Sequence, residues 1–465
     1  MRRKKPGPFS LVNPDAAGID IGSEEHWVAV PADRDDQPIR KFGCVTNEIY
    51  AMADWLRKCG VTNVAMESTG VYWIPVYEIL EDRGFKVCLV NAKHAKNVPG
   101  RKTDVSDCEW LRKLHSFGLV RASFRPDAQT CRLRSYRRHR ETIIQDMSAV
   151  IQRMQKAMIQ MNLQLHKVIS DITGVTGMNI IRAILAGERD PVKLAAMRDW
   201  RIKKNADQIA LALEGDYREE HLFSLKQAVD RYDFHRQQLK ECDQQIKACM
   251  EQFESKPDTD PDPVPEPTGK KRKVQGHQPE FDLSSHLKRI TGVDFTRIPG
   301  LNTLTVQTII SEVGLDPKAF PTAKHFASWL GLCPANKITG GQIKSSKTRK
   351  VANRAATAFR LAAQALAHSH SALGSFYRRK RAQLGAPKAI TAAAHKIARL
   401  FYSLWTNGGP YKDPGQDYYE EKYQDRVLKN IKRTAKQLGY EITLTPMAPP
   451  SASPELCAVP TTCSG

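Results

Sequence analysis

The hydrophobic residues of this chain change their spacing after about residue 120, and this change limits the folds that it can adopt. Before that point, short apolar runs with the alternation of strands are interleaved with helical patterns. We predict strands within 17–30, 63–69 and 85–91, and helices at 54–58 and 74–84. This order predicts an α/β domain built on a mixed sheet.

From Glu141 onward, apolar residues recur every three or four positions for more than three heptads, and the spacing returns after residue 221. Such spacing is typical of a coiled coil, so we expect two long paired helices. Two core helices of a globular domain are the alternative. The two series are Ile144, Met147, Ile151, Met154, Met158, Met161, Leu165 and Val168, and Leu222, Leu225, Val229, Tyr232, Leu239, Cys242, Ile246, Cys249 and Phe253.

Five prolines between Pro257 and Pro267, followed by the basic run at 270–273, predict a stiff polar linker. A mainly helical unit is expected after it, and the tail beyond Pro446 is rich in Pro, Ser and Thr. The predicted divisions are an α/β domain, a helical coiled-coil region, the linker, a mainly helical C-terminal domain, and a helical extension with a tail, at residues 1–125, 126–255, 256–280, 281–415 and 416–465.

The chain is strongly basic, since 71 Lys and Arg against 50 Asp and Glu give a net charge of +21. We therefore expect polyanionic partners, with nucleic acid the foremost. No run of 18 apolar residues exists, and Pro6 and Pro8 interrupt the N-terminus, so we expect neither a membrane span nor export. The ten cysteines form no CxxC pair, which indicates reduced thiols in a cytoplasm and no zinc site.

Two clusters of cations are candidates for phosphate contacts. The first lies within residues 121–140, which hold seven arginines and a single carboxylate, Asp127. Tyr136 and His139 of the same segment offer faces on which bases can stack. A solvated helical face is the alternative reading. The predicted nucleic-acid contacts are Arg101, Lys102, Arg132, Arg134, Arg137, Arg138 and Arg140 in the first half of the chain, and Lys344, Lys347, Arg349, Lys350 and Arg354 in the second. A third basic patch covers residues 377–381.

Two further segments each place a glycine turn before an amphipathic helix, at residues 172–187 and 298–314. They look like the second half of a helix-hairpin-helix element, whose backbone N–H groups can hold a phosphate. An ordinary packing corner is an equally good reading of either one.

Four carboxylates are candidates for catalysis. Asp20 lies inside the first strand, Glu67 ends another strand, and Asp104 and Asp107 lie three residues apart at the start of a predicted helix, on one face. Acids that converge at one edge of a sheet repel each other unless they hold hard cations, so we expect two Mg²⁺ ions there. Taken singly, each acid could instead be structural, and Asp104 could cap its helix.

These motifs, in this order, resemble a known family. GIDIG, AMESTGVYW and KTDVSD look like the N-terminal DEDD domain, with a fold like that of the Holliday-junction resolvase RuvC, of a group of bacterial insertion-sequence transposases. IPGLNTLTVQTIISEVG, FASWLGLCPANKITGG and KTRKVANRAATAFRLAAQAL resemble the C-terminal domain of that group. The resemblance covers about residues 15–415 and implies an RNase H-like fold and a DNA recombinase guided by a structured non-coding bridge RNA.

The resemblance also implies a nucleophile. In that family a serine before glycine attacks the DNA phosphate and forms a covalent protein–DNA link. The matching residue here is Thr339, in ITGG, which carries the hydroxyl but adds a methyl group that stiffens the side chain. Ser345 and Ser346, in a loop expected to be mobile, are the alternates, and all three hydroxyls could instead bind phosphates.

The resemblance thus implies an RNA-guided DNA recombinase, which we expect in the bacterial cytoplasm, associated with the nucleoid. Its partners would be donor DNA, target DNA and the guide RNA, and a dimer or tetramer is expected because strand exchange needs four cuts. The absence of a GxxxxGK[ST] loop agrees with a reaction that uses no ATP. A Mg²⁺-dependent Holliday-junction nuclease that uses water, and a non-enzymatic nucleic-acid scaffold, are the alternatives.

Overall fold

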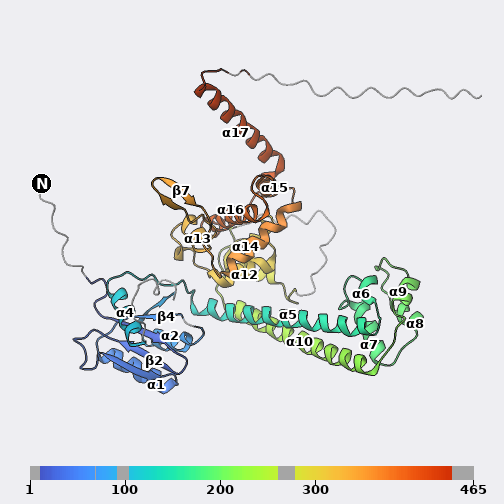
Figure 1. The fold of residues 1–465 in the computed structure, drawn as a ribbon, viewed down its shortest axis with the longest axis horizontal. Helices are drawn as coiled ribbons and strands as arrows, with labels where there is room; N and C mark the ends of the chain where they lie inside the picture. The colour runs from blue at the N-terminus through green and yellow to red at the C-terminus, as the bar shows by residue number, and fades with distance from the viewer. Residues whose placement is uncertain (1–10, 69, 92–103, 260–277, 442, 444–465) are drawn as a thin grey trace, which may run out of the picture. The chain divides into compact units, whose positions relative to one another are not determined.

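The computed structural model describes residues 11–68, 70–91, 104–259, 278–441 and 443, apart from the side chains of 104–106. The chain divides into two compact units, residues 1–125 and 126–465 (Figure 1). The basic run at 270–273, the tail beyond Pro446 and the predicted contacts Arg101 and Lys102 lie outside the described residues.

A five-stranded mixed sheet forms the centre of the first unit, in the order β3-β2-β1-β4-β5. β2 pairs antiparallel with β1 and β3, while β4 pairs parallel with β1 and β5. This strand order is that of an RNase H-like fold, so the predicted fold class is confirmed. The strands are β1 (Ala16–Ile21), β2 (Glu25–Ala29), β3 (Ile39–Gly43), β4 (Asn63–Glu67) and β5 (Lys86–Val90).

Helices cover both faces of this sheet. On one face Ile19, Val28 and Met66 are fully buried in a core completed by α1 (Thr46–Lys58) and α2 (Trp73–Asp82). On the other face α4 (Asp104–Ser116) packs through Leu111 against Ala65 and Val90. Gly18 permits this approach, because a Cβ at Gly18 would lie 2.3 Å from the Cys108 carbonyl oxygen. The backbone of α4 therefore lies directly on β1.

Two helices of 33 residues each, α5 (Ala128–Gln160) and α10 (Glu219–Glu251), run side by side in opposite directions in the second unit. At the far end of this hairpin lie α6 (Leu165–Val168), α7 (Val175–Leu185), α8 (Pro191–Ala196) and α9 (Ala206–Ala212). The predicted pair of long helices is therefore present. The buried face of α5 differs in part from the predicted one. Ile143 and Val150 are buried, whereas the predicted Ile144 and Ile151, one residue further along, are only half-buried.

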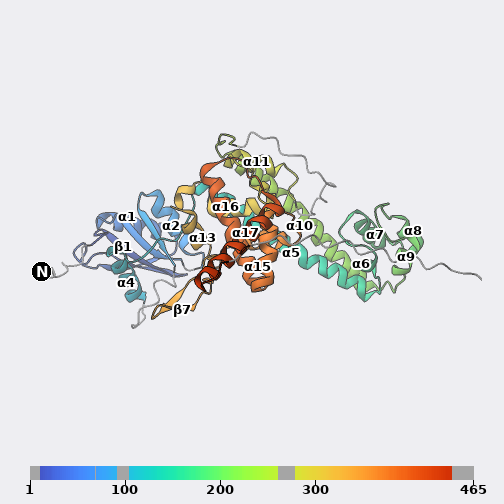
Figure 2. The same ribbon diagram turned by 90° about the horizontal axis from the view of Figure 1, so that it is seen from above.

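The rest of the second unit is mainly helical, as predicted, and one hairpin, β6 (Lys337–Thr339) and β7 (Gln342–Ser345), extends from it (Figure 1). Phe295, Phe326, Phe359 and Phe401 pack together in its core. The helices are α11 (Leu283–Thr291), α12 (Thr303–Val313), α13 (Ala323–Trp329), α14 (Arg354–Ala365), α15 (Ala372–Leu384), α16 (Ala386–Asn407) and α17 (Gly415–Gln437). Figure 2 shows α17 crossing α15, which it contacts.

The glycine turn before α12 is tightly packed on protein, because a Cβ at Gly300 would lie 2.4 Å from the Ala362 carbonyl oxygen. In the turn before α7 a Cβ at Gly174 would lie 3.4 Å from the Asp171 carbonyl oxygen, which is an ordinary contact. The packing at Gly300 favours the interpretation of the turn before α12 as a corner of the fold rather than as a phosphate-binding element.

Candidate active site

Asp20 and Glu67 lie next to each other near the carboxyl ends of two neighbouring inner strands of the sheet. β1 and β4 are parallel neighbours, and their pairing runs from Ala16 with Asn63 to Ile19 with Met66, one residue before each acid. Gly18 and Ala65 are also partners, and residues two apart on a strand share a face. Both acids are therefore placed on the face that α4 covers, where β1 and β4 end.

Asp104 and Asp107 lie in the first turn of α4, just before Cys108. The Cys108 side chain is fully buried on the inner face of α4, and its burial, assisted by the negative charge of Asp20, raises the pKa of its thiol to about 12. Gly18, two residues before Asp20 on the same face of β1, lies directly against the Cys108 backbone, which places Asp20 beside the first turns of α4. Asp107 precedes Cys108 and is exposed. The side chain of Asp104, the first residue of α4, lies outside the described residues.

The donor set suits a hard cation, since Asp20 and Glu67 offer only carboxylate oxygens. Among the side chains that the structure describes, no group of three or more His, Cys, Asp or Glu residues is arranged to hold a metal ion. The predicted set of four acids includes Asp104, whose side chain is not among them. Asp20, Glu67 and Asp107 are the described members of the predicted set, and the metal site stays a prediction.

Thr339 lies at the tip of the β6–β7 hairpin in the second unit. It pairs with Gln342 across a two-residue turn, in which Gly340 and Gly341 have φ of 57° and 75°. Positive φ at both positions is required by the type I′ turn that suits a tight hairpin, and glycine adopts it without strain. Thr339 is exposed. The predicted loose loop is thus an ordered hairpin, and the alternate Ser345 ends its second strand while Ser346 follows it.

Cations surround the hairpin and its base. Lys344, Lys347 and Lys350 are exposed. Arg349 donates a hydrogen bond to the Ser328 carbonyl oxygen, which ties the chain after β7 to α13. Arg354, the first residue of α14, lies 3.8 Å from the carboxylate of Glu141 on α5. The hairpin and the segment that follows it therefore present three exposed lysines and two arginines with protein contacts.

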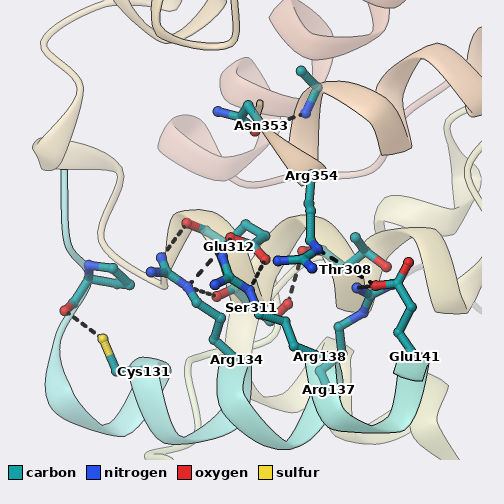
Figure 3. Close-up of polar contacts among 12 residues, drawn as sticks. Cys131, Arg134, Arg137, Arg138, Glu141, Thr308, Ser311, Glu312, Asn353 and Arg354 are labelled. Carbon is teal, nitrogen blue, oxygen red and sulfur yellow. Dashed lines mark hydrogen bonds and ion pairs between the residues drawn. The ribbon is translucent and has the colours of Figure 1, made fainter. Parts of the chain in front are cut away.

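The arginines of α5 have protein partners in this structure (Figure 3). Arg134 donates to the carbonyl oxygens of Ser311 and Glu312 at the end of α12, at 3.1 and 2.8 Å. Arg138 forms a bidentate pair with the Glu312 carboxylate at 2.9 and 2.7 Å. Arg137 pairs with Glu141 at 2.7 Å. Arg134 and Arg138 therefore fasten α5 to the C-terminal end of α12, whereas the Arg137 pair lies within α5.

One of the predicted nucleic-acid contacts therefore needs correction. Arg140 is 4% exposed and pairs with Asp243 of α10, so it is a structural residue. Arg134 donates two hydrogen bonds to the α12 carbonyls, which otherwise lack helical partners, and its side chain is 17% exposed, so its contact with nucleic acid stays a prediction. Arg132 is exposed and donates a hydrogen bond to the side-chain oxygen of Gln252. Its contact with nucleic acid therefore stays a prediction. The sequence analysis missed Glu312 and Asp243, since neither carries a local motif.

A mixed five-stranded sheet with carboxylates where β1 and β4 end defines the first unit as an RNase H-like domain. Comparisons with known proteins agree with this class. A DEDD-type IS110 family model described as transposase matches residues 17–163, and a second, described as transposase of the IS116/IS110/IS902 family, matches residues 294–378. The chain therefore belongs to the IS110 family of insertion-sequence transposases.

One curated relative is the insertion element IS110 uncharacterized 43.6 kDa protein of Streptomyces coelicolor. It is 34% identical over 110 residues, which are 23% of this chain and 26% of the relative. The chain thus matches about a quarter of the length of that relative. No helix among the described residues is both long and apolar enough to cross a membrane.

Proposed function

We propose that this chain is a DNA recombinase that cuts and rejoins DNA when its insertion sequence moves. The observation that supports this most is the placement of Asp20 and Glu67 on one face, at the adjoining ends of β1 and β4 and beside α4. Paired carboxylates on this type of sheet are suited to hold divalent cations beside a phosphodiester. Its membership of a transposase family supports the same reaction class.

Asp20, Glu67, Asp104 and Asp107 would hold the metal, for which Mg²⁺ is the proposed ion. When bound, Mg²⁺ would stabilise the negative charge that develops on the attacked phosphate. Thr339 is the proposed nucleophile. Its Oγ1 would form a bond to phosphorus as the bond to the departing deoxyribose oxygen breaks, and the hydroxyl proton would pass to the departing oxygen through a base or water.

The proposed partners are donor DNA, target DNA and a structured guide RNA. The exposed cations Lys344, Lys347 and Lys350 near Thr339 are suited to hold DNA phosphates, and Arg132 offers another exposed guanidinium. The α5–α10 pair is the proposed coiled coil for subunit pairing, and a tetramer would supply the four cuts that strand exchange needs. The expected location is the nucleoid of the bacterial cytoplasm.

Trapping of a covalent adduct tests this function. Purified protein is incubated with donor and target DNA, and RNA that co-purifies with it is sequenced for segments complementary to both. We expect a protein–DNA conjugate on denaturing gels that Thr339→Ala removes and Thr339→Ser retains, while Ser345→Ala and Ser346→Ala serve as matched hydroxyl controls. Hydrolysed DNA that persists without any conjugate in Thr339→Ala would instead identify a nuclease that uses water.

A further inference from the structure

Two adjoining cavities on the second unit lie outside the residues assigned above. The larger, of about 660 Å³, lies between α13 and α16, and the smaller, of about 190 Å³, lies between α16 and α17. Lys396 of α16 lines both, so they form one continuous surface. The polar lining comprises Thr322, His395, Arg399, Ser403, Thr406 and Asn407 in the larger cavity and Tyr418, Tyr419, Lys422, Tyr423 and Arg426 in the smaller.

This surface has a one-sided charge. No carboxylate belongs to the described lining of either cavity, whereas Lys396, Arg399, Lys422 and Arg426 do. The nearby Glu420 is paired at 3.2 Å with Arg379 of α15. Burial and the positive charge of Arg426 lower the pKa of Lys396, because two cations at this surface repel each other. An anion in the cavities would relieve this repulsion.

Aromatic rings alternate with these cations. The Lys422 ammonium lies 4.5 Å from the centre of the Tyr418 ring, and that of Lys396 lies 4.6 Å from the centre of Phe376. The Arg379 guanidinium lies 3.3 Å from the centre of the Tyr423 ring. Tyr418 is 43% exposed, so its ring is available to a ligand. Flat π faces next to cations suit the stacking of unpaired bases whose phosphates are held alongside.

We propose that the two cavities together bind a single-stranded nucleic acid. Arg399 and Lys396 would hold phosphates in the larger cavity, where the Ser403 hydroxyl, which accepts from Asn407, can donate a further hydrogen bond. Tyr418 and Tyr419 would stack unpaired bases in the smaller cavity. A duplex keeps its bases stacked inside, so it can use only the phosphate contacts. The inference rests on the proposed function only in expecting a polynucleotide partner.

Binding of short labelled oligo(dT), oligo(U) and a duplex of equal length to the full chain tests the proposal. The variant Tyr418→Ala/Lys422→Ala removes one ring and one cation from the smaller cavity. Its matched control, Tyr440→Ala/Lys429→Ala, removes the same groups from exposed positions near the end of α17, outside both cavities. We expect the first variant to weaken single-strand binding about tenfold and duplex binding much less, and the control to change neither.

The Arg399→Gln variant, whose side chain is exposed, gives a second readout. We expect it to reduce the slope of log affinity against log salt by about 0.7 for single strands. Whichever of oligo(dT) and oligo(U) binds with the higher affinity shows whether the surface prefers single-stranded DNA or RNA. Equal losses in variant and control, or equal losses for duplex and single strand, overturn the proposal. The assay needs no cleavage, so Asp20→Asn protein that fails to recombine DNA should still bind, which separates this proposal from the proposed function.

Discussion

Arg140 and Asp243 form a buried ion pair between α5 and α10. Their side chains are 5% and 8% exposed, and Arg140 Nη2 donates to Asp243 Oδ2 at 3.1 Å. The two residues lie 103 positions apart, on helices that run in opposite directions. The pair fixes how the two helices are aligned, because a shift of one turn would leave two charges buried without partners.

We expect Asp243→Ala to lower the free energy of unfolding by about 3–5 kcal/mol, because it leaves the Arg140 charge buried and unpaired. Chemical denaturation followed by circular dichroism, with hydrogen exchange to locate the opened helices, measures the loss. Asp233→Ala is the control, since Asp233 of α10 pairs with Arg182 where both side chains are about half exposed. That change should cost less than about 1 kcal/mol. Equal effects of the two changes would contradict the buried pair.

Gly18→Ala should separate α4 from β1. The new Cβ would meet the Cys108 carbonyl oxygen at 2.3 Å and the Arg112 nitrogen at 2.5 Å, and both are backbone atoms that cannot rotate away. We expect a loss of about 1–3 kcal/mol in stability together with lost DNA cleavage, since α4 carries Asp107. Gly43→Ala is the control, because its Cβ would meet only the flexible Glu48 side chain, at 3.3 Å. Full activity of Gly18→Ala would show that this contact does not position α4.

Asp20→Asn and Glu67→Gln should each reduce DNA cleavage at least about a hundredfold, because both remove a negative charge from the proposed metal site. Chelation of divalent metal should produce the same loss in the wild-type protein. Gel assays of cleavage, with circular dichroism to confirm folding, measure the effect. Asp54→Asn on α1 removes an equal charge from a side chain that is 62% exposed, and it should leave cleavage unchanged. If the Asp20→Asn protein is folded and still cleaves DNA, the acid has a structural role and the proposed metal site is contradicted.

Cys108 should resist alkylation in the folded protein. Burial and the Asp20 charge raise the pKa of its thiol from 9.0 to about 12, so it is protonated at pH 8, whereas Cys44 is exposed. Mass spectrometry after iodoacetamide treatment should find Cys44 modified and Cys108 unmodified until the protein unfolds. Between pH 9 and 12 the unfolded state releases a proton that the folded state retains, so this thiol should lower stability as pH rises. Rapid labelling of native Cys108 at pH 8 would contradict its burial.

The strand positions of Asp20 and Glu67 could be predicted because their signals are local. Asp20 and Glu67 each follow a short apolar run, and such runs predict strands whose ends meet when the strands are parallel neighbours. The sequence could not show which strands are neighbours. The pairing of β1 with β4 decides that, and it depends on contacts between residues far apart in the chain.

The arginines of α5 show the opposite case. Their number and spacing predict a charged helix face, and solvent, phosphate or carboxylate can satisfy such a face equally well. The partner of Arg138 is Glu312, 174 residues further along the chain, and that of Arg140 is Asp243. Neither acid stands out in the sequence.

The sequence by itself therefore determined the class of each segment, the net charge of +21 and the acids at strand ends, because propensity, periodicity and composition act over a few residues. Only the tertiary structure decided which of the cations remain available to a polyanion. It buried Arg140, fastened Arg134 to α12 and left Lys344 and Arg399 exposed. The physical reason is that an arginine or lysine pairs with whichever anion folding brings near it. The residues next to a cation in the sequence do not determine how far it lies from an acid elsewhere in the chain.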